Sequence, residues 1–464
     1  MAAASITLVD TRNPIPKETG MPILGCLPEF AKDPLAFFAR LARQYDDVVE
    51  FHLPMRDMAL VTNPDLAHQI LVKEIRHFRK SDRDMRIMGT VLGKGLVTNN
   101  DFLHHKTQRK LVQPGFHFRR IESYTATMTD YTQRYLESWT GGETRDIADD
   151  MFKLTLYIVS KTLFNIDMSS LERGADTIGK AMQVVQTVIN KRFTQVFHAP
   201  DWVPTPNNRK LIKARAVLNK TIESMIASRT LPNGEVSDAG DMMSMLLKAE
   251  YEDGSQMDKK MVMDELITLF VAGHETTSNA LSWAFYLLAK HPDIQQKLQC
   301  ELDTVLADDQ PAFTHLENLV YTERVVKEAM RLLPPVWTLN TRQANEDIVI
   351  GDYFFPKDKV VFISPYANHH NPRYFKDPDT FDPDRFLPEN EKRLPRQLYI
   401  PFGTGPRVCI GQSFAMMEAK LILASVIQKF EITIAKSQKI EPQAQITLSN
   451  KEGMKVIIKK RKRR

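Results

Sequence analysis

Cysteine is scarce in this sequence, and the scarcity argues against two kinds of protein. The 464 residues include three cysteines, Cys26, Cys300 and Cys409, which are widely separated and odd in number. They form no C-x-x-C pair, so the sequence indicates neither a disulfide framework nor a zinc ribbon. A chain with so few, unpaired thiols fits a reducing cytoplasm.

Long apolar runs are missing as well. A membrane-spanning helix needs about 20 consecutive apolar residues, and neither such a run nor a signal-peptide apolar segment occurs here. Residues 1–20 are interrupted by Asp10, Arg12, Lys17 and Glu18. We therefore expect a soluble, cytoplasmic protein without a transmembrane anchor, with a flexible segment over residues 1–20.

Positive charge is in slight excess, and the excess lies at one end of the chain. The net charge is +5, and the last six residues, Lys459–Arg464, are all basic. Removing these six from the 62 basic residues leaves 56, against 57 acidic residues. We expect a solvated, frayed basic tail over residues 459–464. A nucleic-acid or membrane patch is the alternative, although no aromatic residues interleave with the tail to support nucleic-acid binding.

The remaining composition is that of a globular protein, with 43% hydrophobic and 26% charged residues. No internal repeat or low-complexity linker divides the chain. Although 464 residues is long for one hydrophobic core, we expect a single domain over residues 1–464.

Local patterns predict the main elements. They indicate strands over 48–51, 59–61, 431–434 and 455–458, a helix starting at Asn63, helices over 102–115, 259–290 and 321–333, and mostly helix over 121–229. Residues 78–101 combine many charges with three glycines and predict a long, partly mobile loop. Residues 193–208 contain three prolines and predict an irregular connection.

A glycine-rich segment, Phe402–Gly411, carries the strongest chemical signal. Its glycines permit tight turns and close approach to a flat group. Cys409 precedes an apolar helix pattern, and unpaired amides with the helix dipole at such a start favour a thiolate. Arg407 offers a planar, positive group suited to a carboxylate. An inert core thiol is the usual alternative for a lone cysteine, but this combination indicates a sulfur ligand to haem, with propionates near Arg407.

A second unusual segment lies in the middle of the predicted helix 259–290. Gly273 is followed by three consecutive hydroxyl residues, Thr276–Ser278, which are poor formers of a buried helix. Such residues open or kink a helix, and a broken local rule suggests function. A zinc-protease site is not indicated, because His274-Glu275 lacks the second histidine of H-E-x-x-H.

Both segments resemble signatures of one family. Phe402–Gly411 is similar to the haem-ligand signature F-G-x-G-x-R-x-C-x-G of the cytochrome P450 family, and 272–276 resembles its oxygen-binding motif. The resemblance extends from Pro22 to the last predicted strand. It implies a mainly α fold with a small β lobe, a single haem domain, haem b as cofactor and O2 as co-substrate.

The resemblance also implies roles for individual residues. The implied catalytic residues are Ala272 and Gly273, which would leave room for O2, and Glu275 and Thr276, which would relay protons. The implied cofactor-binding residues are Cys409 as the iron ligand, Arg407, Arg109, His105, Arg342, Phe402, Gly411 and His369. The implied structural triad is Glu328, Arg331 and Arg385, which would lock the Cys409 loop. The implied substrate-pocket residues are Met88, Leu92, Phe270 and Val336.

Simpler explanations stay open for several of these residues. His105 and Arg109 are spaced like an ordinary surface pair, and Glu328 with Arg331 like a surface ion pair. His369 is equally suited to hydrogen bonding in the core. Met88 and Leu92 are equally suited to ordinary loop packing.

The implied reaction is insertion of one oxygen atom from O2 into a C–H or C=C bond of an apolar substrate, such as a fatty acid, terpene, steroid or polyketide. Electrons would come from a separate ferredoxin- or flavodoxin-type donor with its NAD(P)H reductase, and the enzyme would be a monomer that binds no nucleic acid. Two alternatives remain: a haem-thiolate isomerase, dehydratase or peroxygenase, and a non-enzymatic haem carrier or sensor. The Glu275–Thr276 pair argues against both.

Overall fold

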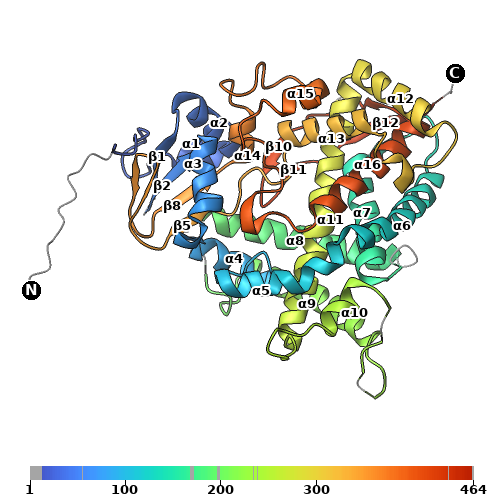
Figure 1. Cartoon of the computed structure of the whole chain (residues 1–464), viewed down its shortest axis with the longest axis horizontal. Coiled ribbons are helices and arrows are strands. Elements are labelled where there is room, and N and C mark those ends of the chain that lie inside the picture. Colours follow the sequence, from blue (N-terminus) through green and yellow to red (C-terminus); the bar gives the residue numbers. More distant parts are fainter. Residues whose placement is uncertain are drawn as a thin grey trace, which may run out of the picture.

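The structure is a computed structural model that describes residues 13–461, apart from Met55, 168–171, 196–198, Gly234, Asp238 and Ser437. Helices form most of it, and the strands β1, β2, β5 and β8 gather in a smaller part at one end (Figure 1). This arrangement confirms the expected mainly α fold with a small β lobe.

The helices and strands have the following bounds. The helices are α1 (Leu27–Lys32), α2 (Pro34–Gln44), α3 (Pro64–His68), α4 (Asp82–Leu92), α5 (Phe102–Val112), α6 (Phe118–Glu137), α7 (Ile147–Phe164), α8 (Glu172–Thr194), α9 (Pro206–Ala227), α10 (Met242–Leu247), α11 (Lys259–Lys290), α12 (Pro292–Leu306), α13 (Val320–Leu332), α14 (Pro365–His369), α15 (Pro388–Glu391) and α16 (Gln412–Lys429). The strands are β1 (Val48–Leu53), β2 (Arg56–Val61), β3 (Phe78–Lys80), β4 (Thr144–Asp146), β5 (Arg342–Ala344), β6 (Ile348–Ile350), β7 (Tyr353–Phe355), β8 (Val360–Ile363), β9 (Phe430–Ile434), β10 (Pro442–Ala444), β11 (Leu448–Asn450) and β12 (Lys455–Lys460).

The long helix α11 has the bounds that the sequence predicts. Asp258 caps its first turn by accepting a hydrogen bond from the Met261 amide at 2.8 Å. The hydroxyls that were expected to open the helix bond back within it, since Thr276 Oγ1 donates to the Ala272 carbonyl at 2.9 Å. The helix therefore continues without a break across its central glycine.

Residues 82–92 form α4, which corrects the prediction of a loop over 78–101. Three glycines favoured a loop, but Gly89 faces open space and is tolerated inside the helix. Apolar residues recur with helical spacing on its buried face: Met85, Met88 and Leu92. The helix ends at Leu92 and is followed by Gly93, whose φ of +57° favours glycine, and by irregular backbone. The irregular connection predicted over 193–208 is confirmed for residues 195 and 199–205, whereas 193–194 belong to α8 and 206–208 to α9; residues 196–198 lie outside the described residues.

The β lobe is a five-stranded sheet with the order β1-β2-β8-β5-β3. β1 and β2 pair antiparallel, and β2 pairs parallel with β8, which lies some 300 residues later in the chain. The lobe has its own apolar core, which is separate from that of the helices. β5 and β3 bring Arg342 and Lys80 next to each other at the edge facing the helices, so the sheet delivers two cations to the site described below.

The predicted flexibility of residues 1–20 is wrong for the part that the structure describes. Residues 13–20 run along the β lobe, where Asn13 bridges Tyr353 and Lys17 bridges Glu50. The Glu50 amide donates to the Pro16 carbonyl at 2.7 Å. Residues 1–12 lie outside the described residues.

The predicted fraying of residues 459–464 is also wrong for its described part. Lys459 and Lys460 belong to β12, which pairs with β9, and the Arg461 guanidinium forms an ion pair with Asp303 of α12. Ladder hydrogen bonds to β9 hold the backbone of Lys459 and Lys460 in the sheet. Burial of alternate side chains earlier in β12 anchors the strand. Residues 462–464 lie outside the described residues.

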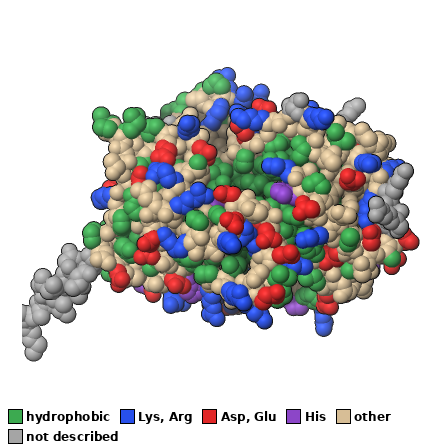
Figure 2. Space-filling model, turned by 90° about the horizontal axis from the view of Figure 1, so that it is seen from above, with side chains coloured by type: hydrophobic (Ala, Val, Ile, Leu, Met, Phe, Trp, Pro, Cys, Tyr) green, Lys and Arg blue, Asp and Glu red, His purple; other side chains and the backbone are tan. Residues whose placement is uncertain are grey.

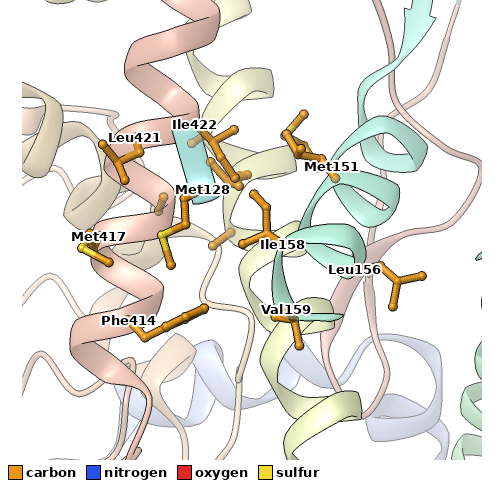
Figure 3. Close-up of a cluster of buried hydrophobic side chains, with 14 of the residues drawn as sticks. Met128, Met151, Leu156, Ile158, Val159, Phe414, Met417, Leu421 and Ile422 are labelled. Atoms are coloured by element: carbon orange, nitrogen blue, oxygen red, sulfur yellow. The ribbon is translucent and has the colours of Figure 1, made fainter. Parts of the chain in front are cut away.

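The main core lies among α6, α7, α11 and α16. Figure 3 shows Met128 of α6, Ile158 of α7, and Phe414, Met417, Leu421 and Ile422 of α16 around this core. These side chains are buried. Replacing a buried leucine of this kind with alanine lowers the free energy of unfolding by about 2–5 kcal/mol. Phe414 also lines the cavity of the site, so the core supports that cavity directly.

On the face shown in Figure 2, acidic and basic side chains are interspersed, and hydrophobic side chains gather in a hollow near its centre. In the part of the chain that the structure describes, no helix combines the length and apolarity needed to cross a membrane.

Candidate active site

A deep cavity separates α11 from the segment that carries Cys409. One wall is formed by Ala272, Gly273 and Thr276 of α11, and the opposite wall by Cys409 and its neighbours. Apolar side chains from α4, α7, α13 and the segment after it complete the walls, including Met88, Leu92, Leu163, Val326, Met330 and Val336. The structure thus brings the two sequence motifs, which lie more than 120 residues apart, to facing sides of one cavity.

The Cys409 segment is held by backbone hydrogen bonds and tight turns. The Cys409 amide donates to the Phe402 carbonyl at 2.9 Å. Gly403 and Gly405 have φ angles of +69° and +70°, which side-chain-bearing residues rarely adopt. A Cβ atom at Gly405 would also lie 2.6 Å from the Leu71 carbonyl oxygen. The segment therefore presents the cysteine in one defined geometry.

The charge state of Cys409 differs from the sequence expectation. The residue is accessible because it faces the cavity, yet protein surrounds the site. Burial raises the pKa of the Cys409 thiol, and the opposing effects of the Gly411 amide and of Arg109 do not outweigh burial. The helix start alone therefore does not produce a thiolate, whereas a coordinated metal deprotonates a bound thiol outright.

Five basic side chains meet at one side of the cavity: Lys80, His105, Arg109, Arg342 and Arg407. Four of them donate to backbone carbonyls: Arg407 to that of Asn99 at 2.8 Å, Arg109 to that of Val408 at 2.6 Å, Arg342 to that of Asn340 at 2.6 Å, and Lys80 to that of Val97. Among the described residues, none of the five forms an ion pair with a carboxylate, and Arg342 Nε has no hydrogen-bond partner.

Burial and mutual repulsion strain this cation cluster. Burial, followed by repulsion from Arg407 and Lys80, lowers the pKa of His105 to about 3. Burial, with Arg407 adding repulsion, lowers the pKa of Arg342 to about 9. Buried charges are normally paired. The cluster therefore fits a group that brings two carboxylates into the cavity, and the facing sulfur fits an iron ligand, so the residues present suit haem.

Glu275 and Thr276 are neighbours in α11, and both line the cavity with Ala272 and Gly273, but their side chains have different partners. The Glu275 carboxylate is buried and accepts a hydrogen bond from the hydroxyl of Thr447, in the turn between β10 and β11. Burial raises the pKa of Glu275, although Thr447 and Gln186 of α8 oppose the shift.

His274 turns away from the cavity. Its ring packs between Phe152 and Phe270, and its Nδ1 lies 2.6 Å from the Phe270 carbonyl oxygen. Burial lowers the pKa of His274 to about 4, which keeps the ring neutral. In the described part of the chain, no cluster of three potential metal-ligating side chains exists.

The structure also brings Glu328, Arg331 and Arg385 together. Arg331 donates to the two Glu328 oxygens at 2.7 and 2.8 Å, and both side chains are fully buried. Arg385 lies 3.3 Å from the same carboxylate. This buried geometry rules out the alternative of a surface ion pair.

Two predicted site residues lie away from the cavity. His369 Nδ1 is 3.1 Å from the Arg331 carbonyl oxygen, and its Nε2 accepts from the Ile400 amide at 3.4 Å. His369 therefore fits the alternative of hydrogen bonding in the core. It does not lie with the five basic side chains that would bind the propionates. Phe270 packs on Phe164 with ring centres 5.9 Å apart and does not line the cavity. Met88, Leu92 and Val336 do line it.

Sequence reasoning missed Lys80 and Thr447. Phe78 and Lys80 are both buried in β3, so strand alternation could have indicated that Lys80 points inward. Thr447 gave no local signal, because its partner lies 172 residues earlier in the chain.

Comparison with known proteins agrees with this geometry. Residues 15–457 match the family model described as Cytochrome P450. The chain is 35% identical to a cyclooctatin synthase of Streptomyces melanosporofaciens over 93% of this chain and 92% of that protein. It is 33% identical to a cyclooctat-9-en-7-ol 5-monooxygenase of the same organism, over 89% of this chain and 88% of that protein. It is 29% identical to a pentalenene oxygenase of Streptomyces avermitilis, over 92% and 93%.

The match covers nearly all of the described chain, and it includes both facing walls of the cavity. Two of these relatives are named as oxygenases, and the family depends on haem and O2. The chain therefore belongs to the cytochrome P450 family, and it is a haem-thiolate monooxygenase that acts on apolar substrates.

Proposed function

We propose that this enzyme hydroxylates or epoxidises a terpene, and that the terpene lies in the cavity between Cys409 and α11. The observation that carries the proposal is the pairing of an apolar cavity with relatives named for cyclooctat-9-en-7-ol and pentalenene, which are both terpenes. Met88, Leu92 and Val336 would contact the substrate and exclude water from it.

Haem b is the proposed cofactor, and Cys409 would be the ligand of its iron. When bound, this group supplies the activation of O2 that oxygen insertion needs. Arg407, Arg342 and Arg109, with Lys80 nearby, would hold the two propionates, which provides these buried cations with the opposite charge that they lack. His105 is neutral and would serve as a hydrogen-bond donor, while Phe402 and Gly411, which line the cavity, would border the ring.

Glu275 and Thr276 are the proposed proton-handling residues. Thr276 uses its own hydroxyl proton in the bond to the Ala272 carbonyl, so its lone pairs remain free to accept a proton donor in the cavity. The raised pKa of Glu275 favours the protonated carboxyl, which can supply a proton. Ala272 and Gly273 carry little side chain and would leave room for O2 next to Thr276.

Glu328, Arg331 and Arg385 are proposed to act on structure and not on substrate. Arg331 also donates to the carbonyls of His369 and Pro378, so the triad ties α13 to the segments that precede Cys409. We further propose a soluble, cytoplasmic monomer that receives electrons from a separate ferredoxin- or flavodoxin-type protein and its NAD(P)H reductase.

The test uses purified holoenzyme, a ferredoxin with its reductase, and isotopically labelled O2. Pentalenene, cyclooctat-9-en-7-ol and dodecanoic acid serve as three probes. We expect labelled oxygen in a product of at least one terpene and none from dodecanoic acid. Oxidation of dodecanoic acid alone would overturn the terpene assignment, and turnover with peroxide but not with O2 would point to a peroxygenase.

Two variants test the residue roles in the same assay. Cys409→Ala should lose the thiolate-type spectrum of the ferrous carbonyl complex; retention of that spectrum would contradict the proposed ligand. Thr276→Ala should bind substrate but release more hydrogen peroxide per NADPH consumed, and unchanged coupling would argue against the proton-handling role.

A further inference from the structure

A short segment, Gly93–Asn99, joins α4 to α5 and lies along the first turns of α11; we call it the strap. Two adjacent carboxylates of α11 accept hydrogen bonds from strap amides. Asp264 Oδ2 accepts from the Lys94 amide at 2.8 Å, and Glu265 Oε2 accepts from the Leu96 amide at 3.0 Å. Glu265 is fully buried.

The strap approaches α11 so closely that only glycine fits at two positions. A Cβ atom on Gly93 would lie 2.1 Å from the Asp264 carboxyl carbon. A Cβ atom on Gly95 would lie 2.1 Å from Thr268 Oγ1. The backbone of the strap is therefore pressed against the two acids, and small movements of it would break their hydrogen bonds.

The strap also reaches both functional walls of the cavity. Leu96 and Val97 line the cavity beside Leu92. The Arg407 guanidinium donates to the Asn99 carbonyl at 2.8 Å, so one of the cations proposed for the propionates is oriented by the strap.

The side-chain amide of Gln108 in α5 links the two ends of the strap. Its Nε2 donates to the Lys94 carbonyl at 3.1 Å, and its Oε1 accepts from Asn99 Nδ2 at 2.6 Å. The position of the strap relative to α11 therefore affects Leu96 and Arg407 together.

We propose that Glu265 is a positioning residue, whose carboxylate fixes the strap and thereby places Leu96 at the substrate wall and Arg407 at the cofactor. The inference rests on the proposed function of the cavity, because it assumes that Arg407 meets the cofactor there. Glu265 itself touches neither substrate nor cofactor.

The choice of a carboxylate at this position supports a functional role. Glu265 Oε1 has no partner in hydrogen-bonding geometry, although the Gln108 amide is near enough to lower its pKa, and an unsatisfied buried oxygen is costly. Burial raises the pKa of Glu265 to about 7. A charged acceptor binds an amide more strongly than a neutral one. The hold on the Leu96 amide therefore strengthens as Glu265 ionises near neutral pH.

Few other titratable groups face Glu265. Asp264 raises its pKa from the same helix, and Tyr251 lies near it on the segment before α11. Lys94 of the strap is exposed. α10 and residues 87–92 of α4 contain no titratable side chain, and α5 contributes the amide of Gln108.

The experiment measures hydrogen–deuterium exchange of the strap amides in the holoenzyme between pH 6 and pH 8.5, corrected for intrinsic exchange rates. In the wild type, we expect the protection to change several-fold across this range, with a midpoint near pH 7. Glu265→Gln keeps an acceptor oxygen but cannot ionise, so its protection should not change with pH. Asp264→Asn is the matched control, because it removes the neighbouring charge and should move the midpoint to lower pH without abolishing the step.

A functional measurement uses carbon monoxide, which does not titrate. Rebinding of CO to the ferrous holoenzyme after photolysis should change with pH in the wild type, with the same midpoint, and should not do so in Glu265→Gln. A pH step that persists unchanged in Glu265→Gln, in either measurement, would overturn the proposal. Failure of the proposed function is seen separately, as a ferrous carbonyl spectrum that lacks the signature of thiolate ligation.

Discussion

The Thr447 hydroxyl donates a hydrogen bond to the Glu275 carboxylate, and this contact joins the β10–β11 turn to the centre of α11. The two residues are 172 positions apart, and both are buried. The bond makes the C-terminal hairpin part of the environment of the acid next to Thr276. It also lowers the pKa of Glu275, against the stronger effect of burial.

Thr447→Val should therefore impair proton supply without removing a residue from the cavity motif itself. Without this donor the pKa of Glu275 rises further and its carboxyl loses its orientation. We expect severalfold more hydrogen peroxide per NADPH consumed. Ser449→Ala, two residues further along the hairpin, should leave the ratio unchanged; equal ratios in all three proteins would contradict the prediction.

The buried triad predicts a large stability effect on α13. Glu328→Gln should lower the free energy of unfolding by about 3–5 kcal/mol, because it leaves the fully buried Arg331 without its counter-charge. Glu323→Gln on the same helix removes a partly exposed carboxylate and should cost about 1 kcal/mol or less. Denaturant unfolding of the holoenzyme measures the free energy of unfolding of both variants. Similar decreases in the two would show that the triad stabilises the fold no more than a surface ion pair does.

Two glycines before Cys409 form a matched pair for haem incorporation. Both have positive φ, so alanine costs about 1–2 kcal/mol at either position. In addition, Gly405→Ala would push a Cβ atom to 2.6 Å from the Leu71 carbonyl oxygen, whereas Gly403→Ala would meet only Leu339, at 3.8 Å. Haem content after purification should therefore fall much more in Gly405→Ala, and equal content would show that the Leu71 contact is unimportant.

Glu265 predicts a pH-dependent stability difference. Its pKa rises from 4.5 to about 7 on folding, so the ionised carboxylate destabilises the folded state, and the loss develops as pH rises between these values. Glu265→Gln does not show this decrease in stability, because glutamine does not ionise. Its free energy of unfolding relative to the wild type should rise by roughly 3 kcal/mol from pH 4.5 to pH 7.5 and then level off. A difference that stays constant with pH would contradict the assigned pKa.

Local patterns predicted those features whose causes are local. The bounds of α11 follow from its apolar pattern and from Asp258, and the geometry around Cys409 follows from its glycines. α4 was missed because three glycines in and after it outweighed a weak helical spacing, although Gly89 meets no neighbour that would exclude it.

Features that depend on distant partners could not be predicted. The inward direction of His369 is set by the Arg331 carbonyl, 38 residues earlier. The raised pKa of Cys409 comes from burial, which no local signal around the helix start reveals. The cation cluster could be predicted only in part, since Lys80 reaches it through a sheet pairing with Arg342.

The segment before α1 has a consequence for how the chain can be trimmed. Its backbone pairs with Glu50 of β1 through two hydrogen bonds. The Glu18 amide donates to the Glu50 carbonyl, and the Glu50 amide donates to the Pro16 carbonyl. Removing residues 13–20 would strip β1 of this cover and leave an unpaired sheet edge, which is a site for intermolecular strand addition. A preparation shortened to residue 21 should self-associate, whereas one shortened to residue 13 should stay dispersed.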